Sequence, residues 1–369
     1  MKRVALSITK ASITCLLTLA LLLSHAPRNA TAEEEQVTFY PTYGYKSAGV
    51  WTIPLRVRVH ENITGASKAA RLAQRVIGQN LNGHALTAEE QTQFTSRVQK
   101  LLTEGESRER VMFTFDHDPR QEQLCIQGPQ GRCLSTNGSG IVEGTLTLSD
   151  ERARALLAAQ QSAHGWLTFH AVSPEHTGVG RVQLIPPTGV SVISDIDDTI
   201  KITEIPAGKR IVLRNTFLHE YRAAPDMARR YREMGPDVAF HYVSSGPWPM
   251  YELLSEFLFS EAVGFPLGSF RMRDMRLSPL SHKFWEDVVS MLTAGAHAPS
   301  FSHKVERISE IMEHFKDRHF ILIGDSGERD PEVYAEIRKQ YPTQVQEIRI
   351  RDVGNGGARL EGMTVIPAE

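Results

Sequence analysis

Three carboxylates, Asp195, Asp197 and Asp198, lie within four residues at the end of the apolar run Val190–Ile193. Carboxylates repel one another, and burying one without a partner is costly, so this group at the end of a strand favours a bound cation. Carboxylate oxygens are hard ligands, which suit Mg²⁺ better than a soft metal. The spacing of Asp195 and Asp197 places both on the same side of an extended chain. One can attack a substrate while the other moves its proton.

This acidic segment has two simpler explanations, a solvated turn and a calcium loop. A solvated acidic turn after a strand is common and remains an alternative for these residues taken alone. A calcium loop of the EF-hand type requires Gly at its sixth position and Glu at its twelfth. Counted from Asp195, those positions hold Ile200 and Pro206, so the calcium loop is excluded.

The second half of the chain, residues 188–369, alternates predicted strands and helices, which is typical of an α/β fold with a parallel sheet. The predicted strands are Val190–Ser194, Val238–Val243, Ser269–Met272, Phe320–Ile323 and Gln346–Ile350. The predicted helices are Ala224–Met234, Pro249–Glu261, Lys304–Phe315 and Pro331–Gln340. Ligands of open α/β sheets bind beyond the carboxyl ends of the strands. We therefore expect Asp195, Ser244 and Asp325 to meet in one crevice.

The preceding part, residues 33–187, is predicted to be a β-rich, sandwich-like domain with a helical insertion. Apolar and polar residues alternate along Trp51–His60, as in a strand with one buried face. Residues 65–104 are predicted to be helical, with a capping signal at Thr87–Glu90. The prolines of Ile185–Gly189 indicate an extended linker between the two domains.

The first 32 residues have the pattern of a secretory signal peptide. Basic residues precede a mostly apolar stretch at positions 11–23, and Ala30–Ala32 offers small residues for cleavage. The apolar stretch is short for a transmembrane helix, although a retained N-terminal anchor is the alternative. We therefore expect an exported protein, periplasmic or extracellular, without a transmembrane span after cleavage.

The cysteines indicate which covalent link the chain can form and which metal it can bind. Cys125 and Cys133 flank a turn-rich stretch and are predicted to form a disulfide, with two free thiols as the alternative. The pair lacks neighbouring histidines and metal-site spacing, so zinc is not expected.

The chain has 41 Lys and Arg against 43 Asp and Glu, a net charge of −2, and loss of the basic leader makes it more acidic. This balance does not favour nucleic-acid binding.

Four segments in order resemble the motifs of the haloacid dehalogenase superfamily of aspartate-nucleophile phosphotransferases. Asp195–Thr199 matches the first motif, Ser244 after an apolar strand the second, Lys304 the third and Gly324–Asp330 the fourth. The fuller strings narrow the resemblance: Asp-Ile-Asp-Asp-Thr-Ile-Lys, Tyr-Val-Ser-Ser-Gly-Pro-Trp, His-Lys and Gly-Asp-Ser-Gly-Glu-Arg-Asp-Pro-Glu. They look like the actin-patch phosphatidate phosphatase catalytic family, over residues from about 188 to 355.

This resemblance implies a Rossmann-like catalytic domain that removes phosphate from phosphatidate in a Mg²⁺-dependent reaction. Asp195 would be the nucleophile, and Asp197 would be the general acid and base, with a pKa raised by neighbouring carboxylates. Mg²⁺ would lie between the Asp195 carboxylate, the Asp197 backbone carbonyl and the Asp325 carboxylate. The lipid substrate would also imply peripheral contact with a membrane.

The remaining motif residues would bind the phosphoryl group. Ser244 and Lys304 would hold its oxygens, and Asp330 would orient Lys304 or a metal-bound water. The role of Asp198 is not assigned. Two other functions stay open: a broad-specificity periplasmic acid phosphatase acting on soluble phosphomonoesters, and a non-catalytic envelope protein that binds a phosphorylated ligand.

Overall fold

The computed structural model describes residues 35–368, apart from positions 84, 276–277 and 294–297. The predicted signal peptide, residues 1–32, lies outside this part of the chain. Glu35–Glu369 groups into one compact unit. The predicted domain boundary between residues 187 and 188 stays a prediction.

The N-terminal half is β-rich, as predicted. Ten strands of the described chain join into one sheet, with the order β6-β5-β8-β10-β2-β3-β1-β9 and with β4 and β7 also paired to β3. The longer strands are β1 (Glu35–Phe39), β2 (Thr42–Ser47), β3 (Val50–Asn62), β5 (Met112–Phe115), β7 (Ile141–Ser149), β8 (Trp166–Ala171) and β10 (Val179–Leu184). The shorter elements are β4 (Thr103–Gly105), β6 (Leu124–Cys125), β9 (His176–Thr177) and helix α4 (Asp150–Ala159).

Alternation along these strands builds one apolar core. Successive side chains of β3 are buried and partly exposed in turn, because a strand points neighbouring residues to opposite faces. The Phe39 ring of β1 packs edge-on against Phe169 of β8 at 5.0 Å between centroids. Strands from both ends of the sheet therefore share a core. The predicted Cys125–Cys133 disulfide is present beside it, with Cα atoms 5.6 Å apart.

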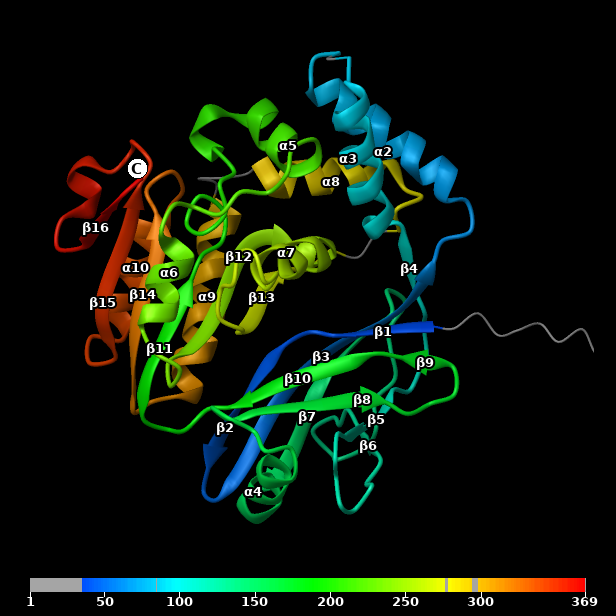
Figure 1. The fold of residues 1–369 in the computed structure, drawn as a ribbon, viewed down its shortest axis with the longest axis vertical. Coiled ribbons are helices and arrows are strands. Elements are labelled where there is room, and N and C mark those ends of the chain that lie inside the picture. Colours follow the sequence, from blue (N-terminus) through cyan, green and yellow to red (C-terminus); the bar gives the residue numbers. More distant parts are fainter. Residues whose placement is uncertain (1–34, 84, 276–277, 294–297, 369) are drawn as a thin grey trace, which may run out of the picture. The chain divides into compact units, whose positions relative to one another are not determined.

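The predicted helical insertion forms two helices, α2 (Ala66–Asn80) and α3 (Ala88–Leu101). Helix α3 begins with the predicted capping box, in which the Thr87 hydroxyl accepts from the Glu90 N–H and the Glu90 carboxylate accepts from the Thr87 N–H. Helices α2 and α3 lie beside α5 (Lys209–Phe217) and α8 (His282–Thr293) of the second half (Figure 1). Their apolar faces share a core with residues of the parallel sheet.

The second half contains a six-stranded parallel sheet with the order β13-β12-β11-β14-β15-β16. Its strands are β11 (Gly189–Ser194), β12 (Ala239–Pro247), β13 (Ser269–Arg273), β14 (Arg318–Asp325), β15 (Val345–Asp352) and β16 (Thr364–Pro367). Its helices are α5 (Lys209–Phe217), α6 (Met227–Glu233), α7 (Tyr251–Leu258), α8 (His282–Thr293), α9 (Ala298–His314) and α10 (Asp330–Gln340). The mixed α/β prediction is confirmed, while β16, α5 and α8 were not predicted.

The register of the sheet places the motif residues at one edge. Ser194, the last residue of β11, lies beside Tyr242 of β12 and Ile323 of β14. Because these strands are parallel, the residues that follow them emerge at the same end of the sheet. No helix in the described ranges has the length and hydropathy needed to cross a membrane.

Candidate active site

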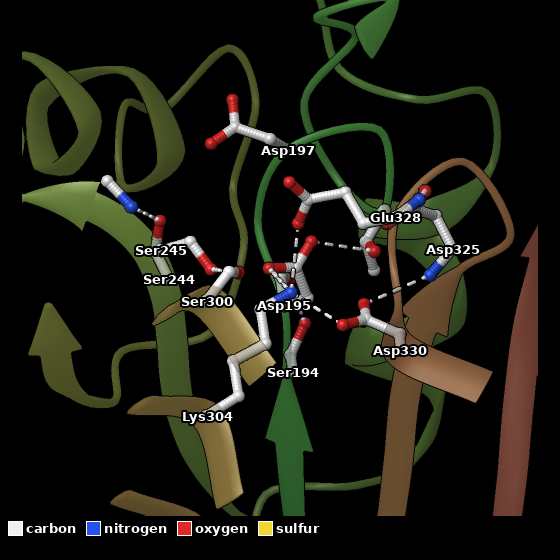
Figure 2. Close-up of polar contacts among 12 residues, drawn as sticks. Ser194, Asp195, Asp197, Ser244, Ser245, Ser300, Lys304, Asp325, Glu328 and Asp330 are labelled. Carbon is white, nitrogen blue, oxygen red and sulfur yellow. Dashed lines mark hydrogen bonds and ion pairs between the residues drawn. The ribbon is translucent and has the colours of Figure 1, made fainter. Parts of the chain in front are cut away.

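Asp195 lies at the centre of this edge and is buried (Figure 2). Its backbone N–H donates to the carbonyl of Ile323 at 2.9 Å. The Thr199 hydroxyl donates to Oδ2 at 3.1 Å, and the Lys304 ammonium lies 2.8 Å from Oδ1. Both carboxylate oxygens therefore have fixed partners, which defines the orientation of the side chain.

Lys304 connects Asp195 to two further carboxylates. This buried lysine of α9 also donates to Asp330 Oδ1 at 2.5 Å and to Glu328 Oε2 at 3.1 Å. Burial alone would lower the pKa of Lys304, but Asp195, Asp330 and Glu328 together raise it well above its ordinary value. The ammonium therefore stays charged and is the central cation of this site.

Asp325, the last residue of β14, is fully buried, and only one of its two carboxylate oxygens has hydrogen-bond partners among the described residues. Its Oδ1 accepts from the backbone N–H groups of Gly327 at 2.6 Å and Glu328 at 3.0 Å. Its Oδ2 is buried and has no hydrogen-bond partner among the described residues. Burial, with the charges of Asp330 and Asp195, raises the pKa of Asp325 well above its ordinary value.

The carboxylates have the donor chemistry of a metal site. Asp195, Asp325 and Asp330 each offer an oxygen, and the three oxygens lie within 4.8 Å of one another. Burial also raises the pKa of Asp195, against the opposing effect of Lys304, so negative charge is in excess here. A divalent cation would neutralise this excess and satisfy Asp325 Oδ2. Three hard oxygen donors fit Mg²⁺ or a similar ion.

Asp197 faces a different set of partners. Its carboxylate points away from Asp195 and Lys304 (Figure 2) and accepts from the Lys201 ammonium and the Thr203 hydroxyl, each at 2.6 Å. Burial alone would raise the pKa of Asp197, but Lys201 and Thr203 lower it below its ordinary value. The expectation of a raised pKa is therefore wrong, because a buried ammonium and not a carboxylate is its nearest charge.

Asp198 anchors the segment that follows the loop of Asp195. Its φ of +58° turns the chain sharply, and its carboxylate accepts three backbone N–H groups. Oδ1 accepts from Thr203 at 2.8 Å and Glu204 at 2.7 Å, and Oδ2 accepts from Ile205 at 2.6 Å. The third carboxylate of the motif therefore ties residues 203–205 to the loop that carries Asp195.

Ser244 lies in β12, next to the strand that leads into Asp195. It is buried, and its hydroxyl oxygen accepts from the Gly246 N–H at 3.0 Å. The hydroxyl can therefore donate its own hydrogen to a ligand. The neighbouring Ser245 hydroxyl contacts the Ser300 hydroxyl of α9. Figure 2 shows Ser244 on the Lys304 side of Asp195.

The structure thus brings Asp195, Lys304, Asp325 and Asp330 into one cluster and places Ser244 on the neighbouring strand. Three residues were not predicted as members of the site, Lys201, Thr203 and Glu328. Burial, opposed by Lys304, raises the pKa of Glu328 to about 7. Glu328 lies inside the fourth motif, and Lys201 lies two residues after the first. The local sequence does not distinguish a buried charge from an exposed one.

Comparison with known proteins agrees with this geometry. Residues 190–352 match the family model described as Phosphatidate phosphatase APP1, catalytic domain. The chain is 32% identical over 176 residues to Phosphatidate phosphatase APP1 of Saccharomyces cerevisiae, covering 46% of this chain and 27% of that protein. It is 28% identical over 180 residues to an uncharacterized protein of Schizosaccharomyces pombe, covering 47% of this chain and 27% of that protein.

The extent of these similarities limits what they cover. The chain spans about a quarter of the length of the curated relatives it matches. Among solved structures, a Ruminococcus gnavus beta-glucuronidase aligns over 88% of this chain and 45% of that chain at 11% identity, with a TM-score of 0.22. That score is too low to indicate a shared fold. Residues 190–352 are therefore similar in sequence to a phosphatidate phosphatase catalytic domain.

Proposed function

We propose that this protein is a Mg²⁺-dependent phosphatase that hydrolyses phosphatidate to diacylglycerol through an aspartyl-phosphate intermediate, in the manner of the haloacid dehalogenase superfamily. The observation that carries the proposal is the buried Asp195–Lys304 pair within a carboxylate cluster at the carboxyl end of a parallel sheet. The match of residues 190–352 to a phosphatidate phosphatase catalytic domain supports the choice of substrate.

Asp195 is the proposed nucleophile because both of its oxygens are held in place while the carboxylate remains next to a cation. In the first step an Asp195 oxygen bonds to phosphorus and the bond from phosphorus to the glycerol oxygen breaks. Lys304 and the Ser244 hydroxyl bind the phosphoryl oxygens, and Asp330 holds Lys304 in position. Asp195 and Asp325 would hold Mg²⁺, which supplies positive charge where two anions must approach.

Asp197 is the proposed proton donor and acceptor. The leaving oxygen departs on the side of phosphorus opposite the nucleophile. Its proton donor must therefore lie on that far side of phosphorus. Figure 2 shows the Asp197 carboxylate directed away from Asp195. The negative charge of a bound phosphate raises the pKa of Asp197 and favours its protonated form. Asp197 then takes a proton from water, whose oxygen attacks the aspartyl phosphate, and this releases inorganic phosphate and restores Asp195.

We also propose that the protein is exported to the periplasm or the cell exterior. The Cys125–Cys133 disulfide supports this location, because disulfides persist in oxidising compartments. The signal-like leader supports it independently.

One comparison tests the proposed function. Purified protein is assayed on phosphatidate in detergent micelles and on p-nitrophenyl phosphate, with Mg²⁺ or with excess EDTA. The expected result is phosphate release from phosphatidate with much the higher kcat/KM, abolished by EDTA and restored by Mg²⁺. A preference for the soluble ester would indicate a broad-specificity acid phosphatase. Binding of phosphorylated ligands without turnover would indicate a non-catalytic protein.

A further inference from the structure

Arg97, in helix α3 of the N-terminal half, lies outside residues 190–352 and is buried against the catalytic half. Its guanidinium donates to the backbone carbonyl of Thr216 at 2.6 Å and approaches that of Asn215 at 3.4 Å. These carbonyls lie at the C-terminal end of α5, where they lack partners within the helix and where a cation is favourable. Arg97 therefore fixes the end of a helix that follows the catalytic loop.

Arg97 also fixes an aromatic ring beside the catalytic loop. The Arg97 Cζ atom lies 4.0 Å from the centroid of the Tyr221 ring, and the Lys201 ammonium lies 5.1 Å from the same centroid. The Tyr221 hydroxyl oxygen is buried and has no hydrogen-bond partner within the described ranges. The ring is therefore held by packing and by cation–π contact with these two residues, and not by its hydroxyl.

A second path leads from α5 to the other partner of Asp197. The Asn215 side-chain amide donates to the Thr203 backbone carbonyl at 3.0 Å. The Thr203 hydroxyl donates to Asp197 Oδ1 at 2.6 Å, the same oxygen that accepts from Lys201. Arg97 is therefore linked to both residues that hold the Asp197 carboxyl group. It contacts Lys201 through Tyr221 and Thr203 through Asn215.

We propose that Arg97 is a positioning residue for Asp197, so that the helical insertion of the N-terminal half completes the catalytic apparatus. This inference rests on the proposed function of Asp197 as the proton donor to the leaving oxygen. Arg97 does not touch the reacting groups, and it acts by fixing Tyr221 and the end of α5, which in turn fix Lys201 and Thr203.

The consequence depends on the leaving group. A misplacement of a catalytic group by about 1 Å can cost on the order of a hundredfold in rate. A strongly basic leaving oxygen needs its proton as the bond breaks, whereas p-nitrophenolate leaves readily without one. Loosening Asp197 therefore slows the release of a basic leaving group much more than the release of p-nitrophenolate. A general loss of folded protein slows both equally.

The test compares phenyl phosphate with p-nitrophenyl phosphate, two soluble esters of similar shape whose leaving groups differ in basicity. Arg97→Met removes the charge and the donors but keeps an apolar stem, and Arg97→Lys keeps the charge. Lys100→Met, on the same helix, removes the ion pair of Lys100 with Glu256 at a partly exposed site and is the matched control. Each is assayed as the full chain with Mg²⁺, and kcat/KM is measured because it reports phosphoryl transfer to Asp195.

We expect Arg97→Met to lower kcat/KM for phenyl phosphate about tenfold more than for p-nitrophenyl phosphate. Arg97→Lys should recover part of that difference, and Lys100→Met should leave the ratio of the two values at the wild-type level. In an Asp197→Asn background, Arg97→Met should add no further selective loss, since the group that it positions is already inactive.

Two results would overturn the inference: an equal loss on both esters in a folded Arg97→Met protein, or a selective loss that persists in the Asp197→Asn background. If Arg97→Met does not fold, Tyr221→Leu interrupts the same path without altering the α5 carbonyl contacts and must show the same selective loss. A wild-type protein that hydrolyses neither these esters nor phosphatidate would contradict the proposed function itself.

Discussion

The Lys304 ammonium lies 2.8 Å from Asp195 Oδ1 and 2.5 Å from Asp330 Oδ1, and all three side chains are buried. One ammonium thus faces Asp195, Asp330 and Glu328, with Asp325 close by. Its single positive charge cannot neutralise four carboxylates. Burial, together with the neighbouring carboxylates, raises the pKa of Asp195 and Asp325. A second cation bound here would neutralise the remaining negative charge.

Replacing Lys304 by Met should abolish most activity and destabilise the protein. Removing one partner of a buried ion pair costs about 3–5 kcal/mol, because the remaining charge is left uncompensated. We expect a loss of this size in the free energy of unfolding by urea in EDTA, with a smaller loss in Mg²⁺. The exposed Lys316→Met is the control and should change stability by less than about 0.5 kcal/mol. Equal stability of both variants would contradict the central role of Lys304.

Replacing Asp195 by Asn should remove turnover while preserving the fold. The amide has the shape of the carboxylate but cannot form the aspartyl phosphate. Because burial raises the pKa of Asp195, loss of its charge should leave the melting temperature in EDTA equal to or above that of the wild type. Retention of more than about a hundredth of kcat, a loss below roughly 3 kcal/mol, would exclude Asp195 as the nucleophile.

Replacing Asp325 by Asn should weaken Mg²⁺ binding more than phosphate binding. The buried and unpartnered Oδ2 is the atom that a cation would satisfy. Thermal unfolding at increasing Mg²⁺ should show a rise in melting temperature for the wild type and a much smaller rise for the variant. The exposed Asp317→Asn should behave as the wild type. An unchanged Mg²⁺ response in Asp325→Asn would place this residue outside the metal site.

Stability should fall in mild acid because of His60 in β3. Burial and the Arg58 charge lower the pKa of His60 from 6.5 to about 4. The unfolded chain therefore binds the proton first as the pH falls, and the contribution present above pH 6.5 is lost between about 6.5 and 4. It amounts to about 3 kcal/mol. Urea unfolding across this range should give a flatter pH profile for His60→Gln, whereas the exposed His282→Gln should keep the wild-type slope.

Part of the site could be predicted from the sequence, because three of its residues end or follow strands. Asp195, Ser244 and Asp325 each end or follow an apolar run, and parallel strands bring their carboxyl ends to one edge whatever the connections between them. The Cys125–Cys133 pair and the Thr87–Glu90 capping box were predictable for a similar reason, since residues close in sequence must be close in space. Local patterns of this kind do not depend on how distant segments pack.

The remaining helices and site contacts depend on long-range packing. Helices α5 and α8 were not predicted, because their apolar faces are buried only where α2 and α3 pack on them. The partner of Asp197 depends on the fold of residues 201–203, and Arg97 reaches Asn215 across 118 residues. No local pattern specifies the distant carbonyl to which a buried guanidinium donates, because that contact depends on how whole helices pack together.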